Sequence, residues 1–192
     1  MNATYITIPL IFLIDSLFSL YILAIVLRFL LQCVRADFQN PISQFLVKIT
    51  HPSLKFLRRY IPAIKKIDTS SIVLALLLQM ITDVSILFLQ NVKTSLITLT
   101  IISFSQLISL ALNIFIFAIF AQALLSWFNP NHHNPAIGLL ENLTRPILNI
   151  CRRYIPDLGG FDLSPLVALI LLQLTKMLLL PPLERLAYII EI

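Results

Sequence analysis

Long uncharged apolar runs alternate with shorter polar stretches along this chain. About 20 consecutive apolar residues cross the hydrocarbon core of a bilayer as a helix. Four of the runs therefore predict membrane-spanning helices, at about 6–31, 70–91, 96–128 and 165–183. The third run contains no charged residue, Gly or Pro, so we expect one long helix there rather than two spans joined by a turn. The pattern predicts an all-α membrane protein with four transmembrane helices.

The polar stretches that follow the first and third spans each predict an amphipathic helix. Both helices start with Asn-Pro, at residues 40–41 and 134–135. Asn is a preferred N-cap, and Pro is preferred at the first helical position. Apolar residues then recur at helical spacing, with polar and basic residues on the other side. We expect these helices to occupy residues 41–60 and 135–154 and to lie in the membrane interface.

Each predicted interfacial helix contains a proline near its middle, Pro52 in the first and Pro146 in the second. A proline removes a backbone donor and clashes with the preceding turn. We therefore expect either one kinked helix or two short helices at each place. For the same reason Pro181-Pro182 is expected to end or kink the fourth span near residue 183.

The pentapeptide Arg-Arg-Tyr-Ile-Pro occurs twice, 94 residues apart, and indicates an internal duplication. The same offset makes 17 of the 40 aligned positions identical between residues 40–79 and 134–173. Polar residues share in this agreement, which hydrophobic bias alone could not produce. We predict two tandem parallel repeats, 1–94 and 95–192, each made of a span, a kinked interfacial helix and a span. The pentapeptides supply the predicted contacts with the membrane surface or a partner: Arg58, Arg59, Tyr60, Arg152, Arg153 and Tyr154.

Composition and charge placement agree with this model. The chain is 58% hydrophobic and only 12% charged, about half the charged fraction of soluble domains. Its first basic residue, Arg28, lies near the end of the first apolar run, so we expect a retained span rather than a signal peptide. From there the Arg28 side chain can extend to the membrane interface. Ten of the 14 Lys and Arg residues lie in the two polar connections. Basic residues mark the cytoplasmic side, so we predict cytoplasmic connections and both termini outside.

Apart from Arg28 near the end of the first span, three charged residues fall inside predicted spans: Asp15, Asp83 and Lys176. A charge at mid-membrane costs roughly 2.5–3.5 kcal/mol on insertion scales, so it usually faces protein or water and has a partner. The repeat offset places Asp83 opposite Met177, next to Lys176. We therefore hypothesise an interhelical Asp83–Lys176 pair, which is either structural or part of an ion or proton pathway.

Asp68 and Asp162 precede the second span of each repeat. Each can cap that span or hold the Arg pair of its own repeat. A catalytic role for either carboxylate is not expected.

Several function classes find no support in the sequence. The histidines and the cysteines, Cys33 and Cys151, lack the spacing of a metal or redox site. No phosphate-binding loop or nucleophile motif occurs. The basic connections lack the interleaved aromatic residues of a nucleic-acid surface. We expect no enzyme activity, no cofactor, no metal and no nucleic-acid partner.

The second repeat carries a recognisable set of motifs. They are Ser126-Trp127-Phe128, Leu143-Thr144-Arg145-Pro146, the second pentapeptide, and Gly159-Gly160-Phe161-Asp162-Leu163-Ser164-Pro165. This combination resembles the YggT/YlmG family of small membrane proteins of bacteria and plastids. The resemblance implies a bacterial inner-membrane location and a link to osmotic or ion tolerance, cell-division gene clusters or membrane assembly processes.

Two functions remain open at this point. The first is a non-catalytic scaffold or assembly factor that presents its basic interfacial helices to anionic lipid headgroups, to partner membrane proteins or to further copies of itself. The second is an ion channel or transport accessory protein involved in osmotic or potassium tolerance. A conducting path should be continuous and lined by the intramembrane polar residues, namely Asp15, Gln79, Asp83, Gln122, Gln173 and Lys176. A scaffold should bury these residues in pairs.

Overall fold

The computed structural model describes residues 2–61, 68–128, 134–154 and 162–191, and all the regular structure in these ranges is α-helical. In chain order, the helices are α1 (Asn2–Cys33), α2 (Pro41–Arg58), α3 (Thr69–Gln90), α4 (Leu96–Phe128), α5 (Pro135–Tyr154) and α6 (Ser164–Glu191). The predicted all-α class is confirmed for the part of the chain that the structure describes.

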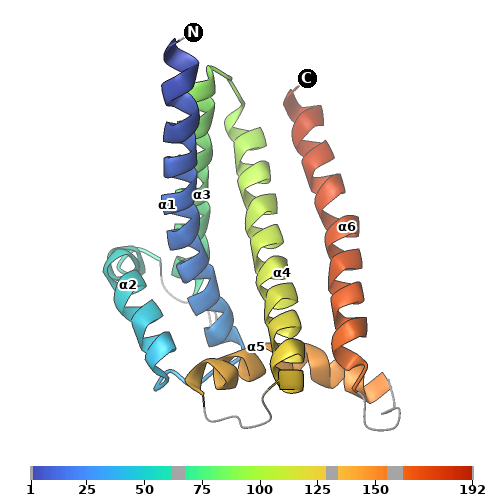
Figure 1. The fold of residues 1–192 in the computed structure, drawn as a ribbon. Coiled ribbons are helices and arrows are strands. Elements are labelled where there is room, and N and C mark those ends of the chain that lie inside the picture. The colour runs from blue at the N-terminus through green and yellow to red at the C-terminus, as the bar shows by residue number, and fades with distance from the viewer. Residues whose placement is uncertain (1, 62–67, 129–133, 155–161, 192) are drawn as a thin grey trace.

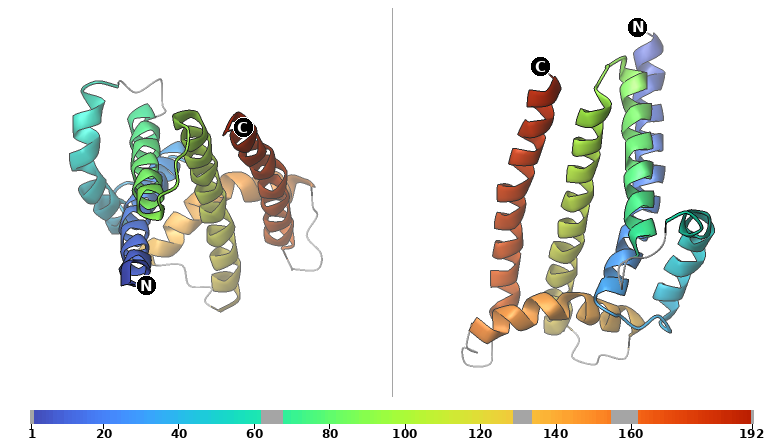
Figure 2. Two further views of the ribbon diagram at one scale, coloured as in Figure 1. Left: turned by 90° about the horizontal axis from the view of Figure 1, so that it is seen from above. Right: turned by 180° about the vertical axis from the view of Figure 1, so that it is seen from behind.

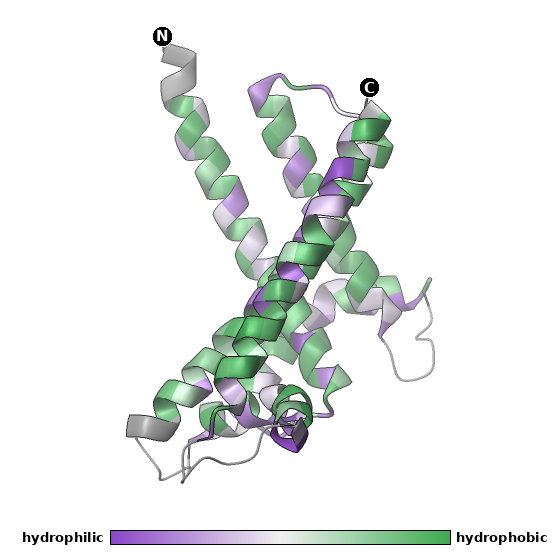
Figure 3. Ribbon diagram, turned by 90° about the vertical axis from the view of Figure 1, so that its right-hand side faces the viewer, coloured by the Kyte–Doolittle hydropathy of each residue, from purple (hydrophilic) through white to green (hydrophobic). Residues whose placement is uncertain are grey.

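Four of these helices are long and apolar enough to cross a membrane: α1, α3, α4 and α6. They lie side by side, with both chain ends at one end of the bundle (Figure 1). Large apolar side chains on their outer faces remain exposed, for example Phe12 at 71%, Phe117 at 70% and Leu178 at 74%. Such faces suit contact with lipid. Figure 3 shows these helices as predominantly hydrophobic, with hydrophilic residues at intervals along them.

The spans form an open row rather than a closed ring. Helix α3 packs on α1 and α4, whereas α6 contacts only α4 and α5 among the described helices. Helix α2 leans against α1 and α3, and α5 crosses the ends of the spans and contacts α1, α2, α4 and α6 (Figure 2). Helices α2 and α5 therefore share the end of the bundle opposite the termini.

The buried core fills the half of the bundle near α2 and α5. Its largest cluster takes side chains from all of the first five helices, α1 through α5. Fully buried residues such as Ile22, Ile25 and Leu54 lie in it. A smaller cluster around Ile119 and Ala168 joins α4, α5 and α6. The apolar faces of the amphipathic helices thus close one end of the bundle.

Prolines do not end the helices that contain them. Helices α2 and α5 continue through Pro52 and Pro146 as single helices, so the alternative of two short helices is wrong. Helix α6 continues through Pro181 and Pro182 to Glu191, well beyond the expected end near residue 183. A proline removes only one helical hydrogen bond, and contacts beyond the pair hold α6 against α4. Ala187 is fully buried, and its carbonyl accepts a hydrogen bond from Thr98 Oγ1 at 3.3 Å.

Candidate functional site

The first pentapeptide ends helix α2, and its first arginine is part of an ion pair. Arg58 donates to Asp68 Oδ2, which also accepts a hydrogen bond from Ser71 Oγ at 3.0 Å. The Asp68 side chain is only 2% exposed, whereas that of Arg58 is 39% exposed. The guanidinium therefore joins the end of α2 to the start of α3 and leaves part of its surface free.

The second pentapeptide makes the corresponding pair at the end of α5. Arg152 donates to Asp162 Oδ2 through Nε at 2.9 Å and through Nη2 at 2.7 Å. Asp162 Oδ1 accepts from the backbone N–H of Ser164 at 2.9 Å and so caps α6. Both side chains are more exposed than in the first pair, at 52% and 33%. Each Asp therefore holds the first Arg of its own pentapeptide, one of the two roles that the sequence left open.

Both carboxyl groups have lowered pKa values. Burial alone raises the pKa of Asp68, but hydrogen bonds from Arg58 and Ser71 and the positive charges of Arg58 and Arg28 outweigh it. Burial also raises the pKa of Asp162, and the hydrogen bonds from Ser164 and Arg152 together with the Arg152 charge outweigh that effect. Both pairs are therefore ionised near neutral pH.

The remaining residues of the two pentapeptides project outward. Arg59 and Arg153 are exposed, and Tyr60 and Tyr154 are 67% and 80% exposed. The ring of Tyr60 lies 5.5 Å from that of Phe56, centroid to centroid. The predicted surface residues of each pentapeptide thus split into a bound arginine and an exposed Arg-Tyr pair beside it. The Ile-Pro of the second copy and Pro62 of the first lie outside the described residues.

Helix α2 has three faces rather than two. One face is buried against the spans and contains Ser43, Leu46, Thr50 and Leu54. A second face is apolar but exposed, with Phe45 at 61% and Phe56 at 66%, and Tyr60 follows just beyond the helix at 67%. The third face is polar and exposed and contains Gln44, Lys48 and Lys55, with Arg59 just beyond the helix end. A helix with these faces can touch protein, lipid and water at once.

A second set of contacts, missed in the sequence, ties each amphipathic helix to a span. Arg28 Nη1 donates to Thr50 Oγ1 at 2.7 Å, and Arg28 is 6% exposed. Thr144 Oγ1 donates to Gln122 Oε1 in the second repeat. Gln122 follows Arg28, and Thr144 follows Thr50, by 94 residues, the offset between the two pentapeptides. The sequence signal for these contacts was that polar residues recur 94 positions apart both in the spans and in the helices that follow them. Arg28 is thus held inside the protein and does not extend to the interface as a free charge.

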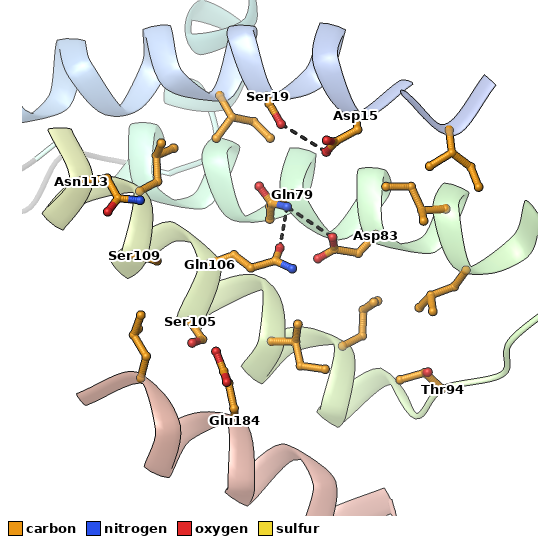
Figure 4. Close-up of a pocket in the computed structure, with 18 residues that line it drawn as sticks. Asp15, Ser19, Gln79, Asp83, Thr94, Ser105, Gln106, Ser109, Asn113 and Glu184 are labelled. Atoms are coloured by element: carbon orange, nitrogen blue, oxygen red, sulfur yellow. Dashed lines mark hydrogen bonds between the residues drawn. The ribbon is translucent and has the colours of Figure 1, made fainter. Parts of the chain in front are cut away.

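The opposite half of the bundle contains a partly polar cavity of about 650 Å³. It lies between α1, α3, α4 and α6, and the α3–α4 connection reaches it through Thr94 (Figure 4). Carboxylates, amides and hydroxyls supply more than half of its lining residues. These polar residues are Asp15, Ser19, Gln79, Asp83, Thr94, Ser105, Gln106, Ser109, Asn113 and Glu184.

The polar side chains on the α3–α4 wall of the cavity are hydrogen-bonded to one another. Asp83 accepts from Ser103 Oγ at 2.6 Å and from Gln79 Nε2 at 3.2 Å. Gln79 Nε2 also donates to Gln106 Oε1 at 2.6 Å, as Figure 4 shows. Among the described contacts, Asp15 on α1 accepts one hydrogen bond, from Ser19 Oγ at 3.3 Å, which is longer than those of Asp83. The α3–α4 wall is therefore fixed by its own hydrogen bonds, while Asp15 faces it from α1.

The hypothesised Asp83–Lys176 pair is wrong. Lys176 Nζ on α6 donates to Asn113 Oδ1 on α4 at 2.8 Å, whereas Asp83 accepts from Ser103 and Gln79. The pairing assumed that α3 and α6 face each other as repeat equivalents. In the structure α4 lies between them, because α3 and α6 both pack on α4 and not on each other.

Comparison with known proteins decides the family. A family model described as CCB3/YggT matches the chain twice, over residues 7–89 and 101–183. The chain belongs to the CCB3/YggT family. The two matches start 94 residues apart, the offset between the two pentapeptides. The resemblance predicted from the motifs of the second repeat is thus confirmed.

Relatives of this YggT-family chain come from bacteria and plants. It is 43% identical over 172 residues to an uncharacterized protein of Pseudomonas aeruginosa. That alignment covers 88% of this chain and 87% of the relative. It is 34% identical over 166 residues to the uncharacterized protein YggT of Escherichia coli K12, which covers 86% of each chain. A shorter match, 41% over 62 residues, links it to the YlmG homolog protein 2, chloroplastic, of Arabidopsis thaliana, covering 32% of this chain and 24% of the relative. No solved structure matches the chain significantly.

Proposed function

We propose that this YggT-family protein is a non-catalytic membrane scaffold. Its helices α2 and α5 present basic and aromatic side chains to anionic lipid headgroups. The same helices also present these side chains to partner membrane proteins. The proposal places these helices on the cytoplasmic side of a bacterial inner membrane and both termini outside. It assigns the protein no reaction of its own.

The observation that carries the proposal is the three-faced helix α2. Its exposed Lys48, Lys55 and Arg59 run beside an exposed apolar row that includes Phe45 and Phe56. Aromatic side chains favour the boundary between headgroups and acyl chains. A basic residue near an anionic leaflet contributes about 1 kcal/mol. The exposed side of α2 therefore suits a surface where negative charge lies next to apolar chains. The headgroup region of an anionic lipid bilayer is such a surface.

The fixed geometry of the basic end supports a docking role. Arg58 and Arg152 bind carboxylates at the start of the next spans, so the ends of α2 and α5 are held in place. Asn40 Nδ2 also donates to the Pro135 carbonyl at 2.7 Å, which joins the starts of the two amphipathic helices. Both helices therefore form one rigid basic surface, and docking to it requires little ordering of the protein.

The proposed orientation follows the distribution of charge. Helices α2 and α5 share one end of the bundle, and the basic connections belong to that end (Figure 1). The positive-inside rule assigns such an end to the cytoplasm. A reporter fused after Ile192 should be active only outside the cytoplasm. Cytoplasmic activity of that fusion would reverse the orientation.

Binding of anionic lipid is tested by thermal unfolding of the purified protein in nanodiscs. Phosphatidylglycerol is expected to raise Tm relative to phosphatidylcholine, and added salt should reduce the difference. The variant Lys48→Gln/Lys55→Gln/Arg59→Gln should lose most of this lipid-dependent rise. The control Lys93→Gln/Arg185→Gln removes two charges from the opposite end of the bundle and should keep it.

The result also separates lipid from protein partners. A Tm rise that is equal in the basic-face variant and the control would remove anionic lipid from the proposal. If that basic-face variant then also retains every partner captured by crosslinking in membranes, the scaffold proposal itself fails.

The second candidate function, an ion channel or transport accessory, is favoured by one observation, the polar cavity. Of the six residues expected along a conducting path, Asp15, Gln79 and Asp83 line it. Gln122 instead accepts from Thr144 of α5, and the buried core begins at Ile22, at the inner end of the cavity. Ion flux into proteoliposomes that requires Asp83, tested with Asp83→Asn, would favour this candidate over the scaffold. Absence of flux would count against it.

A further inference from the structure

The polar cavity has features that a lipid-docking scaffold does not require. It reaches the α3–α4 connection through Thr94, at the end that carries both termini, and it extends inward as far as Ile22 and Asn113. Intramembrane carboxylates are costly unless they face protein or water. At about 30 Å³ for each water molecule, 650 Å³ holds roughly 20 of them. The carboxylates, amides and hydroxyls of this lining therefore favour water over lipid tails beside them.

The charge of the lining has one sign. Three carboxylates reach the cavity from three different helices, Asp15 from α1, Asp83 from α3 and Glu184 from α6, and its lining residues include no Lys, Arg or His. Lys176 does not line the cavity, but its amine donates to the lining residue Asn113. Clefts with apolar walls and one sign of charge concentrate the opposite ion.

The neutral lining suits a cation as well. Side-chain oxygens of Ser19, Ser105 and Ser109 and the amides of Gln106 and Asn113 lie around the same space (Figure 4). The described residues contain no group of three or more His, Cys, Asp or Glu side chains that could hold a metal ion. The carboxylates are thus spread over the walls and do not converge on one point. Such walls favour a cation that keeps part of its water or donates hydrogen bonds in several directions over a divalent metal bound directly.

We propose that this cavity is a water-filled vestibule that binds a small monovalent cation from the side of the termini. The ligand is either an alkali ion or a primary ammonium ion, since both offer a single positive charge of small radius. The apolar core between Ile22 and α5 closes the inner end, so the vestibule binds the cation without passing it on in this conformation. The site lies in the half of the bundle opposite the basic surface and is independent of the proposed lipid docking.

Thiol labelling tests the vestibule directly. In a Cys33→Ser background, where Cys151 is buried, Ser19→Cys and Ser109→Cys place a thiol on opposite walls of the cavity. The control Phe117→Cys places one on the outer face of α4, where Phe117 is 70% exposed. Each protein, in proteoliposomes, is treated with a cationic and an anionic methanethiosulfonate reagent of similar size. Gel filtration checks that each variant is folded.

The vestibule predicts a charge preference at the two cavity thiols. The cationic reagent should react roughly tenfold or more faster than the anionic one, within the range of electrostatic focusing. Asp83→Asn or Asp15→Asn should lower this ratio, and Asp37→Asn in the opposite connection should leave it unchanged. Cavity thiols that react no faster than the Phe117→Cys thiol, or that show no charge preference, would overturn the proposal.

Competition identifies the cation. Potassium chloride and methylammonium chloride are added at constant ionic strength against N-methylglucamine chloride, whose cation is too bulky to share the site. Protection of the Ser109→Cys thiol that saturates with potassium alone identifies an alkali-ion site, with methylammonium alone an ammonium site, and with both a site for either ion. Protection by neither ion at any concentration would overturn the binding claim even if the charge preference is found.

Discussion

At the residue scale, equivalent side chains of the two halves make equivalent contacts at different depths. Asp68 is almost fully buried where it meets Arg58, while Asp162 is one-third exposed where it meets Arg152. Arg28 is buried against Thr50, and the neutral Gln122 takes its place against Thr144. The same contacts therefore contribute different amounts to the free energy of unfolding in the first and second halves of the chain.

Removing the arginine of each pair should reveal this difference. Arg58→Gln leaves a buried carboxylate without its cation and should destabilise the protein toward the lower end of roughly 3–5 kcal/mol, since Arg58 is itself partly exposed. Arg152→Gln should cost only about 0.2–1 kcal/mol, as exposed pairs do. Reversible unfolding in mixed detergent micelles measures both, with Arg59→Gln as the unpaired control. Equal losses in the two variants would contradict the difference in burial.

The lowered pKa of Asp68 predicts an acid dependence of stability. Because the folded-state pKa lies below the unfolded value of about 3.9, the pair contributes its full stability above that unfolded value. The contribution is lost as pH falls through the lowered folded-state pKa. Unfolding measured from pH 6 downward should show a steeper acid loss in the wild type than in Asp68→Asn. Parallel curves for the two proteins would mean that the carboxylate is not linked to folding.

At the element scale, prolines and caps act differently from what their local preferences suggest. Helices α2, α5 and α6 each continue through internal prolines because tertiary contacts hold both sides of the break. The Asn caps do follow local rules: Asn40 Oδ1 accepts from the Ile42 N–H at 2.9 Å, and Asn134 Oδ1 accepts from the Ala136 N–H at 3.0 Å. Asn40 has a further role, since its amide also donates to α5.

Substitutions of the two caps should separate these roles. Asn134→Ala should cost about 1 kcal/mol, a usual value for a lost N-cap. Asn40→Ala should cost about 0.5–1.5 kcal/mol more, the range of a typical hydrogen bond, because the link to the Pro135 carbonyl is lost as well. Asn40→Asp keeps the cap acceptor and removes the donor, so it should recover only the cap contribution. Unfolding free energies of the three variants check this, and equal costs for the two alanine variants would argue against the link.

At the scale of the whole molecule, the order of the spans decides which polar groups meet. Helix α4 lies between α3 and α6, so Asp83 binds Ser103 of α4 while Lys176 binds Asn113 of α4. The polar residues of the outer half therefore surround a cavity and do not form one central ion pair. The inner half is closed by apolar side chains of the spans and of the amphipathic helices.

A double-mutant cycle tests this arrangement. Asp83→Asn and Lys176→Met should have additive effects on unfolding free energy, within about 0.3–0.5 kcal/mol, because the two groups share no direct contact. Asp83→Asn with Ser103→Ala, whose side chains are bonded at 2.6 Å, serves as the coupled control. A large coupling between Asp83 and Lys176 would restore the ion pair that the sequence suggested.

The sequence alone determined the all-α class, the four apolar spans and the family of this protein, because these depend on local periodicity and on motifs carried within short segments. Helix α4, Leu96–Phe128, has the predicted bounds, and the Asn caps lie where expected. The sequence also named the binding of the Arg residues by Asp68 and Asp162 as one of two open roles, and the structure shows both pairs.

Only the tertiary structure decided the partners of Asp83 and Lys176, the continuation of α6 through its prolines and the existence of the cavity. Each depends on which spans are neighbours and how closely they pack. A repeat offset states which residues correspond but not which helix lies between them. The row in which α4 separates α3 from α6 is set by side-chain packing across the whole bundle.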